Sequence, residues 1–138
     1  MSAQTFAVTL LATALFGCDA TSKHIDQKID GVVSFNERPT PGLALRLQAD
    51  GSSTCDSGSL SFTTDAKGSF SGSRKADIGR LAVIVQKDTL CVLDGQRWRA
   101  VWHGTYGPAP EALNFKCNRN GSEWKCTMNG LESHERKA

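Results

Sequence analysis

The sequence of 138 residues lacks the short motifs that mark common catalytic sites. It has no Gly-x-Ser-x-Gly motif, which would present a nucleophilic serine on a sharp turn. It also has no phosphate-binding glycine loop, because residues 68–72 form a strand pattern with small side chains. No spacing typical of paired catalytic carboxylates occurs among the acidic residues Asp77, Asp88, Asp94 and Glu111. The sequence therefore predicts a protein that is not an enzyme.

The chain also lacks a strong charge of either sign. Its 16 Lys and Arg residues against 14 Asp and Glu residues leave a formal net charge of +2, and these residues are scattered. Nucleic-acid binding needs a clustered basic stripe, so we expect no nucleic-acid partner. Only three histidines occur, and the cysteines lack the paired short spacings of zinc modules, so we expect no metal and no cofactor.

No apolar run is long enough to span a bilayer, which takes about 20 residues. The run at residues 6–17 instead has the length of a signal-peptide core, with small residues at its end. The order Leu15-Phe16-Gly17-Cys18 resembles the lipobox of bacterial lipoproteins. This resemblance implies that residues 1–17 are removed as a signal peptide and that Cys18 becomes an acylated, palmitate-carrying N-terminus. The alternative is a buried N-terminal strand or helix in which Cys18 is a core residue.

Charged residues begin directly after Cys18, and residues 19–28 have the composition of a tether. Because two or three acyl chains anchor a protein stably, the resemblance implies a lipid-anchored protein of the bacterial cell envelope that faces the periplasm. Asp19 resembles an inner-membrane retention signal, although the choice between inner and outer membrane stays open. The expected organisation is a signal peptide (1–17), a lipidated cysteine and tether (18–28), a β-sandwich domain (29–128) and a charged tail (129–138).

Four of the five cysteines remain after Cys18 is set aside: Cys55, Cys91, Cys117 and Cys126. An even number in an exported domain predicts two disulfides, and four cysteines allow three connectivities. The sequence favours Cys117 to Cys126, since they flank a hairpin turn near Gly121. They face each other if the turn centres on residues 121–122, whereas Cys117 opposes Trp124 if it centres on 120–121. By elimination, the other disulfide joins Cys55 to Cys91.

Short β-strand signals separated by turns fill the body of the chain, and helix signals are few. Alternating or β-branched segments occur at residues 31–35, 43–48, 60–64, 69–71, 81–85, 89–93, 96–103 and 113–128, where the last contains a hairpin. Many short strands at regular spacing predict an all-β sandwich of about seven to nine strands.

Two segments resemble transthyretin-like, or carboxypeptidase-regulatory-like, domains. One is Gly31-Val32-Val33 followed by the Pro39-Thr40-Pro41-Gly42 turn and an alternating strand. The other is Thr63-Thr64-Asp65-Ala66-Lys67-Gly68-Ser69-Phe70, which is similar to the T-D-x-x-G-x-F signature of those domains. There Asp65 can cap the turn, Gly68 can take a positive φ and Phe70 returns to the core. The resemblance implies a transthyretin-like (prealbumin-like) antiparallel sandwich. Residues 95–117 also resemble a bacterial family of transthyretin-like domains of unknown function.

Aromatic and basic residues gather between residues 96 and 107. In a regular strand, Trp98 and Trp102 share one face with Ala100, and we expect both tryptophans in the core. Arg97, Arg99 and His103 then share the other face with Val101. Because Arg is enriched in interface hot spots, a protein-binding surface is a hypothesis for Arg97, Arg99, His103 and Tyr106.

The leading hypothesis is therefore a membrane-anchored, non-enzymatic module that binds another protein, in envelope assembly or in immunity to a toxin. A first alternative is a carbohydrate-binding β-sandwich module, which would need Trp98, Trp102 or Trp124 exposed for stacking on sugars. A second alternative is a hydrolase with an unrecognised site, in which His103 would lie near a carboxylate in a cleft.

Overall fold

The structure is a computed structural model that describes residues 24–49, 55, 60–77, 86–106 and 110–133. These residues form ten strands and no helix, so none of them supplies a long apolar helix that could cross a membrane. The strands are β1 (His24–Phe35), β2 (Arg38–Pro39), β3 (Ala44–Gln48), β4 (Leu60–Thr63), β5 (Ser69–Asp77), β6 (Gln86–Asp94), β7 (Arg97–Tyr106), β8 (Ala112–Asn120), β9 (Glu123–Met128) and β10 (Leu131–Glu132). The prediction of an all-β sandwich is confirmed. Ten strands are described where about seven to nine were predicted, and β2 and β10 have only two residues each.

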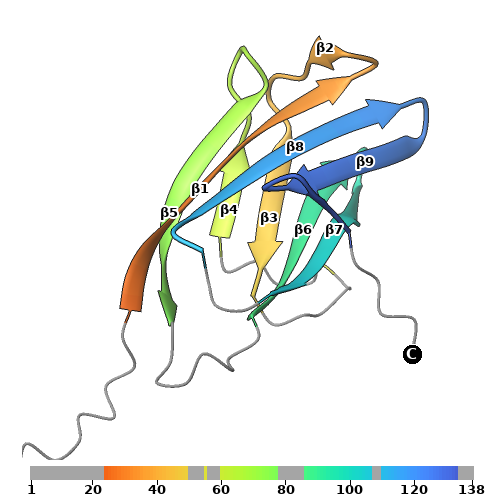
Figure 1. Cartoon of the computed structure of the whole chain (residues 1–138). Helices are drawn as coiled ribbons and strands as arrows, with labels where there is room; N and C mark the ends of the chain where they lie inside the picture. Colours follow the sequence, from red (N-terminus) through yellow and green to blue (C-terminus); the bar gives the residue numbers. More distant parts are fainter. Residues whose placement is uncertain (1–23, 50–54, 56–59, 78–85, 107–109, 134–138) are drawn as a thin grey trace, which may run out of the picture.

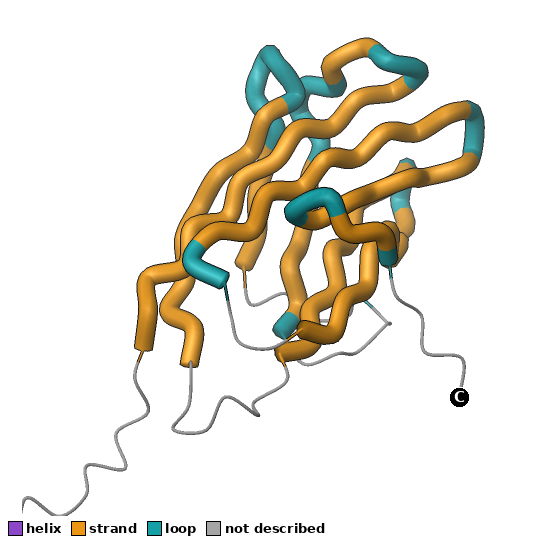
Figure 2. The backbone as a smooth tube through the Cα atoms, in the orientation of Figure 1, coloured by secondary structure: helices purple, strands orange, loops and turns teal. Residues whose placement is uncertain are grey.

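Two sheets pack face to face (Figures 1 and 2). The six-stranded sheet has the order β10-β9-β8-β1-β2, with β5 also paired to β1, and the four-stranded sheet has the order β4-β3-β6-β7. One pair departs from the predicted antiparallel arrangement, because β1 and β8 are parallel. The long connection between them, which runs through β2 to β7, returns the chain to the end of the sandwich where β1 begins.

Both ends of the domain extend beyond the predicted boundaries. Strand β1 begins at His24, so residues 24–28 pair with β5 and are not a free tether. The inward-facing residues at this end of β1 are Ile25, Gln27 and Ile29, and Gln27 is fully buried. Because Gln27 is polar, the sequence here lacks the apolar alternation that would have predicted a strand. At the other end, β10 lies within the predicted charged tail and pairs with β9. The predicted signal peptide and the predicted strand at 81–85 lie outside the described residues.

The core lies between the sheets and uses every second residue of the long strands. Its members are buried aliphatic and aromatic side chains: Ile29, Val33, Leu43, Leu45, Leu47, Phe62, Phe70, Leu90, Val92, Trp102, Leu113, Phe115 and Met128, with Cys117 and Cys126. Aromatic rings run through its centre, where Phe70 lies between Phe62 and Phe115 and the Trp102 ring meets Phe115 edge-on at 5.3 Å.

The turn between β4 and β5 has the geometry that its sequence predicts. Asp65 Oδ1 accepts hydrogen bonds from the backbone N–H groups of Lys67 and Ser69, both at 2.9 Å. Gly68 has a φ of +72°, and a Cβ there would lie 2.4 Å from the Val33 carbonyl oxygen. Phe70 then returns to the core. This turn therefore fixes the start of β5 against β1.

Both predicted disulfides are present, joining Cys55 to Cys91 and Cys117 to Cys126. Cys117 and Cys126 lie directly opposite each other because Asn120 pairs with Glu123, which centres the hairpin turn on residues 121–122. Of the two turns that the sequence allowed, the structure has the first.

A bulge in β7 overturns the prediction that Trp98 and Trp102 share a face. Trp102 pairs with Leu90 and Ala100 pairs with Cys91, so Val101 is an extra residue that reverses the alternation. Trp102 enters the core at 1% exposure. Trp98 lies on the outer face of the four-stranded sheet, where the Arg46 guanidinium covers its ring at 3.9 Å.

The Trp102 ring lies across Gly104, where an added Cβ would be 2.0 Å from Cη2 of the indole. We therefore expect Gly104→Ala to displace the ring and lower the free energy of unfolding by about 1–3 kcal/mol, the usual cost of overpacking a core. Chemical denaturation monitored by tryptophan fluorescence measures this loss. Thr105→Ala at the exposed neighbouring position is the control and should change stability little; equal stability of both variants would contradict the packing described.

Candidate functional site

The four residues predicted to form one binding surface lie in separate places along β7. Arg97 and Arg99 precede the bulge, are exposed, and lie at the end of the strand next to the β6–β7 turn. His103 follows the bulge on the outer face, six residues or about 20 Å from Arg97. Tyr106 is the last residue of β7, opposite Gln86. The prediction of a shared face for Arg97, Arg99, Val101 and His103 is therefore wrong, for the same reason as for the tryptophans.

Arg97 and Arg99 flank a polar cluster centred on Asp94. The Asp94 carboxylate accepts hydrogen bonds from Arg119 Nη1 at 3.0 Å and from Trp124 Nε1 at 3.4 Å. Arg99 Nη1 lies 3.7 Å from the same carboxylate, with 54% of the Arg99 side chain exposed. Asp94 thereby links the β6–β7 turn to the opposite sheet and leaves Arg99 open to solvent on one side.

The turns around this cluster are bound to one another. The Asn36 N–H donates to the Arg119 carbonyl at 2.7 Å, and Asn36 Oδ1 accepts from the Gly121 N–H at 3.2 Å. Arg99 Nη1 also reaches the Ser122 carbonyl at 3.5 Å. We call this end of the sandwich, formed by residues 36–37, 94–97, 99 and 120–122, the hairpin tip. It lies at the opposite end of β1 and β8 from His24 (Figure 1).

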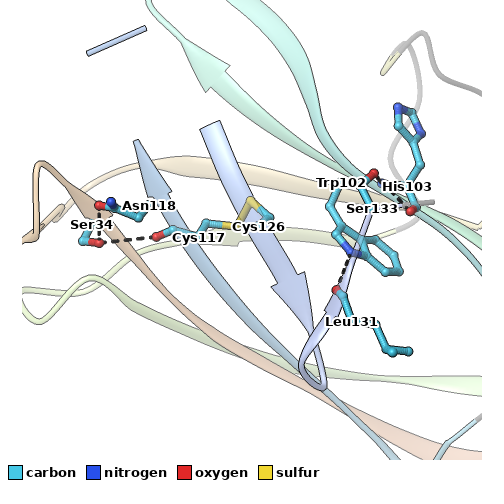
Figure 3. Close-up of a disulfide and its surroundings, with 8 residues drawn as sticks. All are labelled: Ser34, Trp102, His103, Cys117, Asn118, Cys126, Leu131 and Ser133. Atoms are coloured by element: carbon cyan, nitrogen blue, oxygen red, sulfur yellow. Dashed lines mark hydrogen bonds between the residues drawn. A yellow bond between two sulfur atoms is a disulfide. The ribbon is translucent and has the colours of Figure 1, made fainter. Parts of the chain in front are cut away.

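The edge of β7 beyond the bulge is held by the C-terminal segment (Figure 3). Trp102 Nε1 donates to the Leu131 carbonyl at 3.3 Å. Ser133 Oγ accepts from the His103 N–H at 2.9 Å and donates to the His103 carbonyl at 3.2 Å. The segment after β9 therefore bridges the two sheets, which was not foreseen because residues 129–138 read as a charged tail.

His103 lacks the surroundings of a catalytic base within the described residues. Its Nδ1 lies 3.1 Å from Thr89 Oγ1, and no described carboxylate lies within hydrogen-bonding distance of the ring. Across the same residues, no group of three or more His, Cys, Asp or Glu side chains is placed to hold a metal ion. The geometry that the hydrolase alternative requires is not found there.

A platform for stacking on sugars needs an exposed tryptophan ring, and none of the three tryptophans is an exposed residue. Trp102 is buried, and Arg46 covers Trp98. Trp124 is half-buried, meets the Phe35 ring edge-on at 5.4 Å and donates to Asp94. These positions weaken the carbohydrate-binding alternative.

A buried polar cluster at the other end of the sandwich was missed by sequence reasoning. Arg74 on β5 and Asp88 on β6 form an ion pair at 2.8 Å between the two sheets, with 12% and 0% of their side chains exposed. Arg74 Nε also donates to Gln27 Oε1 at 2.9 Å, and Gln27 Nε2 donates to the Pro110 carbonyl at 2.7 Å. Gln27, Arg74 and Asp88 are polar residues at strand positions that face the other sheet. Which positions face inward is known only once the pairing register of the strands is known.

Comparisons with known proteins add little to this geometry. No protein-family model and no curated protein matches the chain. Among solved structures, the chain is similar to chlorocatechol 1,2-dioxygenase from Pseudomonas putida, with a TM-score of 0.41 and 13% sequence identity over 78% of this chain and 61% of that one. The chain thus spans less than two thirds of the dioxygenase chain, and nothing about its activity follows from so distant a likeness.

Removing one partner of the buried ion pair should destabilise the fold strongly. We expect Arg74→Met to lower the free energy of unfolding by about 3–5 kcal/mol, because it leaves a buried carboxylate without its guanidinium partner. Arg99→Met, which removes the exposed pair with Asp94, should cost about 1 kcal/mol or less. Urea denaturation of both variants measures the difference, and similar losses would show that burial does not set the strength of these pairs.

Proposed function

We propose that this protein is a lipid-anchored, periplasm-facing lipoprotein whose sandwich is a non-enzymatic module that binds another protein. The observation that carries the proposal is the cysteine pairing. Two disulfides use four of the five cysteines and indicate an oxidising, extracytoplasmic compartment. Cys18, directly after Leu15-Phe16-Gly17, is then left for acylation. The transthyretin-like family assignment is part of the proposal and rests on the sequence motifs.

The fold gives such an anchored domain a defined polarity. β1 begins at His24, six residues after Cys18, and six extended residues reach at most about 20 Å. This tether is shorter than the ten residues expected from the sequence. The end of the sandwich where β1 begins would therefore stay near the bilayer, and the hairpin tip would point away from it.

A tip directed away from the membrane is the natural place for a protein partner. Its turns are fixed by hydrogen bonds between them, so little conformational entropy is lost on binding. Arg97 and Arg99 are exposed there, and guanidinium groups bind carboxylates through paired hydrogen bonds. We infer that the partner, an envelope-assembly component or a neutralised toxin, presents acidic residues to this tip.

Cys18→Ser tests the anchor. The variant cannot be acylated, so we expect it to accumulate as an uncleaved precursor or to leave the membrane fraction, and to take up no labelled palmitate. Fractionation of cells and metabolic labelling measure both effects. Cys55→Ser is the matched control, because it removes a disulfide cysteine without touching the anchor and should still be labelled. Normal labelling of Cys18→Ser would refute the proposal of an anchor.

Arg97→Glu combined with Arg99→Glu tests the partner surface. Reversing both charges should abolish capture of the partner from an envelope extract, since like charges would then meet across the interface. Quantitative mass spectrometry of captured proteins is the measurement. Lys116→Glu combined with Lys125→Glu makes the same change of charge on exposed positions of the six-stranded sheet and should leave capture intact. Equal capture by all variants would exclude the tip as the binding surface.

A further inference from the structure

The edge of β5 carries backbone groups that face away from the rest of the sheet. Val33 N–H donates to the Gly68 carbonyl, which makes this pair hydrogen-bonded and fixes the alternation along the β1–β5 ladder. From that register, the N–H and C=O groups of residues 70, 72, 74 and 76 point toward β1. Those of Ser69, Ser71, Ser73 and Lys75 point outward.

The first of these outward residues is already covered. Asp65 donates its backbone N–H to the Ser69 carbonyl and accepts the Ser69 N–H through Oδ1, both at 2.9 Å. This pairing supports the register independently. Ser71, Ser73 and Lys75 have no such cover, since within the described residues β5 pairs with β1 alone and no other hydrogen bond reaches their outward groups.

We propose that the β5 edge binds an extended segment of another protein, which adds a strand to the six-stranded sheet through Ser71, Ser73 and Lys75. These three residues together offer three outward N–H groups and three outward C=O groups at the spacing of a β-ladder. Strand addition to an open sheet edge is a common mode of peptide recognition. A groove of about 500 Å³ borders the first half of the edge at Ser69 and Ser71 and continues over the outer face of the sheet to Asp30, Val32 and Asn114.

Side chains next to the edge define the chemistry of this segment. Lys75 is exposed on the outer face. Asp26 lies opposite it on β1, but no ion pair joins them among the described residues, so Lys75 can pair with an acidic residue on an added strand. On the inner side, Phe62 lies against Gly72, and the half-buried Leu60 precedes it on β4. The segment would thus alternate between polar residues facing outward and apolar residues facing Leu60 and Phe62.

A second copy of this chain is a poorer occupant, by an argument that rests on the proposed lipid anchor. Two β5 edges pair symmetrically only as antiparallel strands, around a two-fold axis near Ser73. The two β1 strands would then begin at opposite ends of the joint sheet. Because each tether reaches about 20 Å at most, the two domains could then not both direct their hairpin tips away from one bilayer.

Site-specific cross-linking in the full, lipidated chain tests the proposal. A photoreactive amino acid at position 73 should give an adduct with another envelope protein, mapped by mass spectrometry to one extended segment. The same amino acid at position 127, on β9 of the same sheet, is the control and should give none. No adduct from position 73, an equal adduct from position 127, or an adduct with a second copy of this chain would each overturn the proposal.

A synthetic peptide of the mapped segment then serves as the probe. Ser73→Pro removes an outward N–H without breaking the ladder to β1, so the affinity for the peptide should fall at least about tenfold, whereas Ser73→Ala should keep it. If Ser73→Pro does not fold, Lys75→Glu is the alternative test. It should weaken peptide binding, whereas the control Lys116→Glu should not. Unchanged affinity in Ser73→Pro or in Lys75→Glu would overturn strand addition. The anchor and the tip are tested separately, by the substitutions of Cys18, Arg97 and Arg99. A negative result at the β5 edge is therefore distinguishable from a failure of the proposed function.

Discussion

Strand β1 is the element on which the rest of the structure depends, because both of its edges are paired. Its backbone groups alternate between β8 on one side and β5 on the other, and the Lys28 N–H donates to the carbonyl of Glu111, directly before β8. One strand thus joins an antiparallel pair and a parallel pair in a single sheet. A shift of one residue in β1 would expose Ile29 and Val33 and bury the charged residues Lys28 and Asp30.

The two ends of the sandwich are held together by different physical means. At the end where β1 begins, the buried ion pair of Arg74 and Asp88 joins the sheets in a setting with little water. At the hairpin tip, Asp94 joins them through Arg119 and Trp124 while solvent still reaches Arg99. The first arrangement serves the fold, whereas the second leaves Arg99 exposed, as the proposed partner surface requires. The tip and the β5 edge are separate surfaces, so the two proposed partners would not compete for one site.

Much of the fold was predictable from local patterns. The β6–β7 hairpin follows from the Asp94-Gly95 turn signal between two strand patterns. The β8–β9 hairpin, the Asp65 turn and both disulfides follow from turn residues, alternation and an even cysteine count. The candidate site was predicted only in part. Arg97 and Arg99 are exposed as expected, but the bulge at Val101 separates them from His103. Nothing in the sequence marks that residue as an insertion, because a bulge is defined by the partner strand and not by the strand that contains it.

The sequence by itself determined the all-β class, the even number of cysteines that predicts two disulfides, and the apolar run before Cys18, since each depends on residues close together or on simple counting. The tertiary structure alone decided that Trp102 is inside and Trp98 outside, that Gln27, Arg74 and Asp88 meet in the core, and that no other described strand covers the β5 edge along Ser71 and Ser73. The physical reason is the same for all three. Which way a side chain or a backbone group points in a sheet depends on register with a neighbouring strand, and register is set by contacts between residues far apart in the chain.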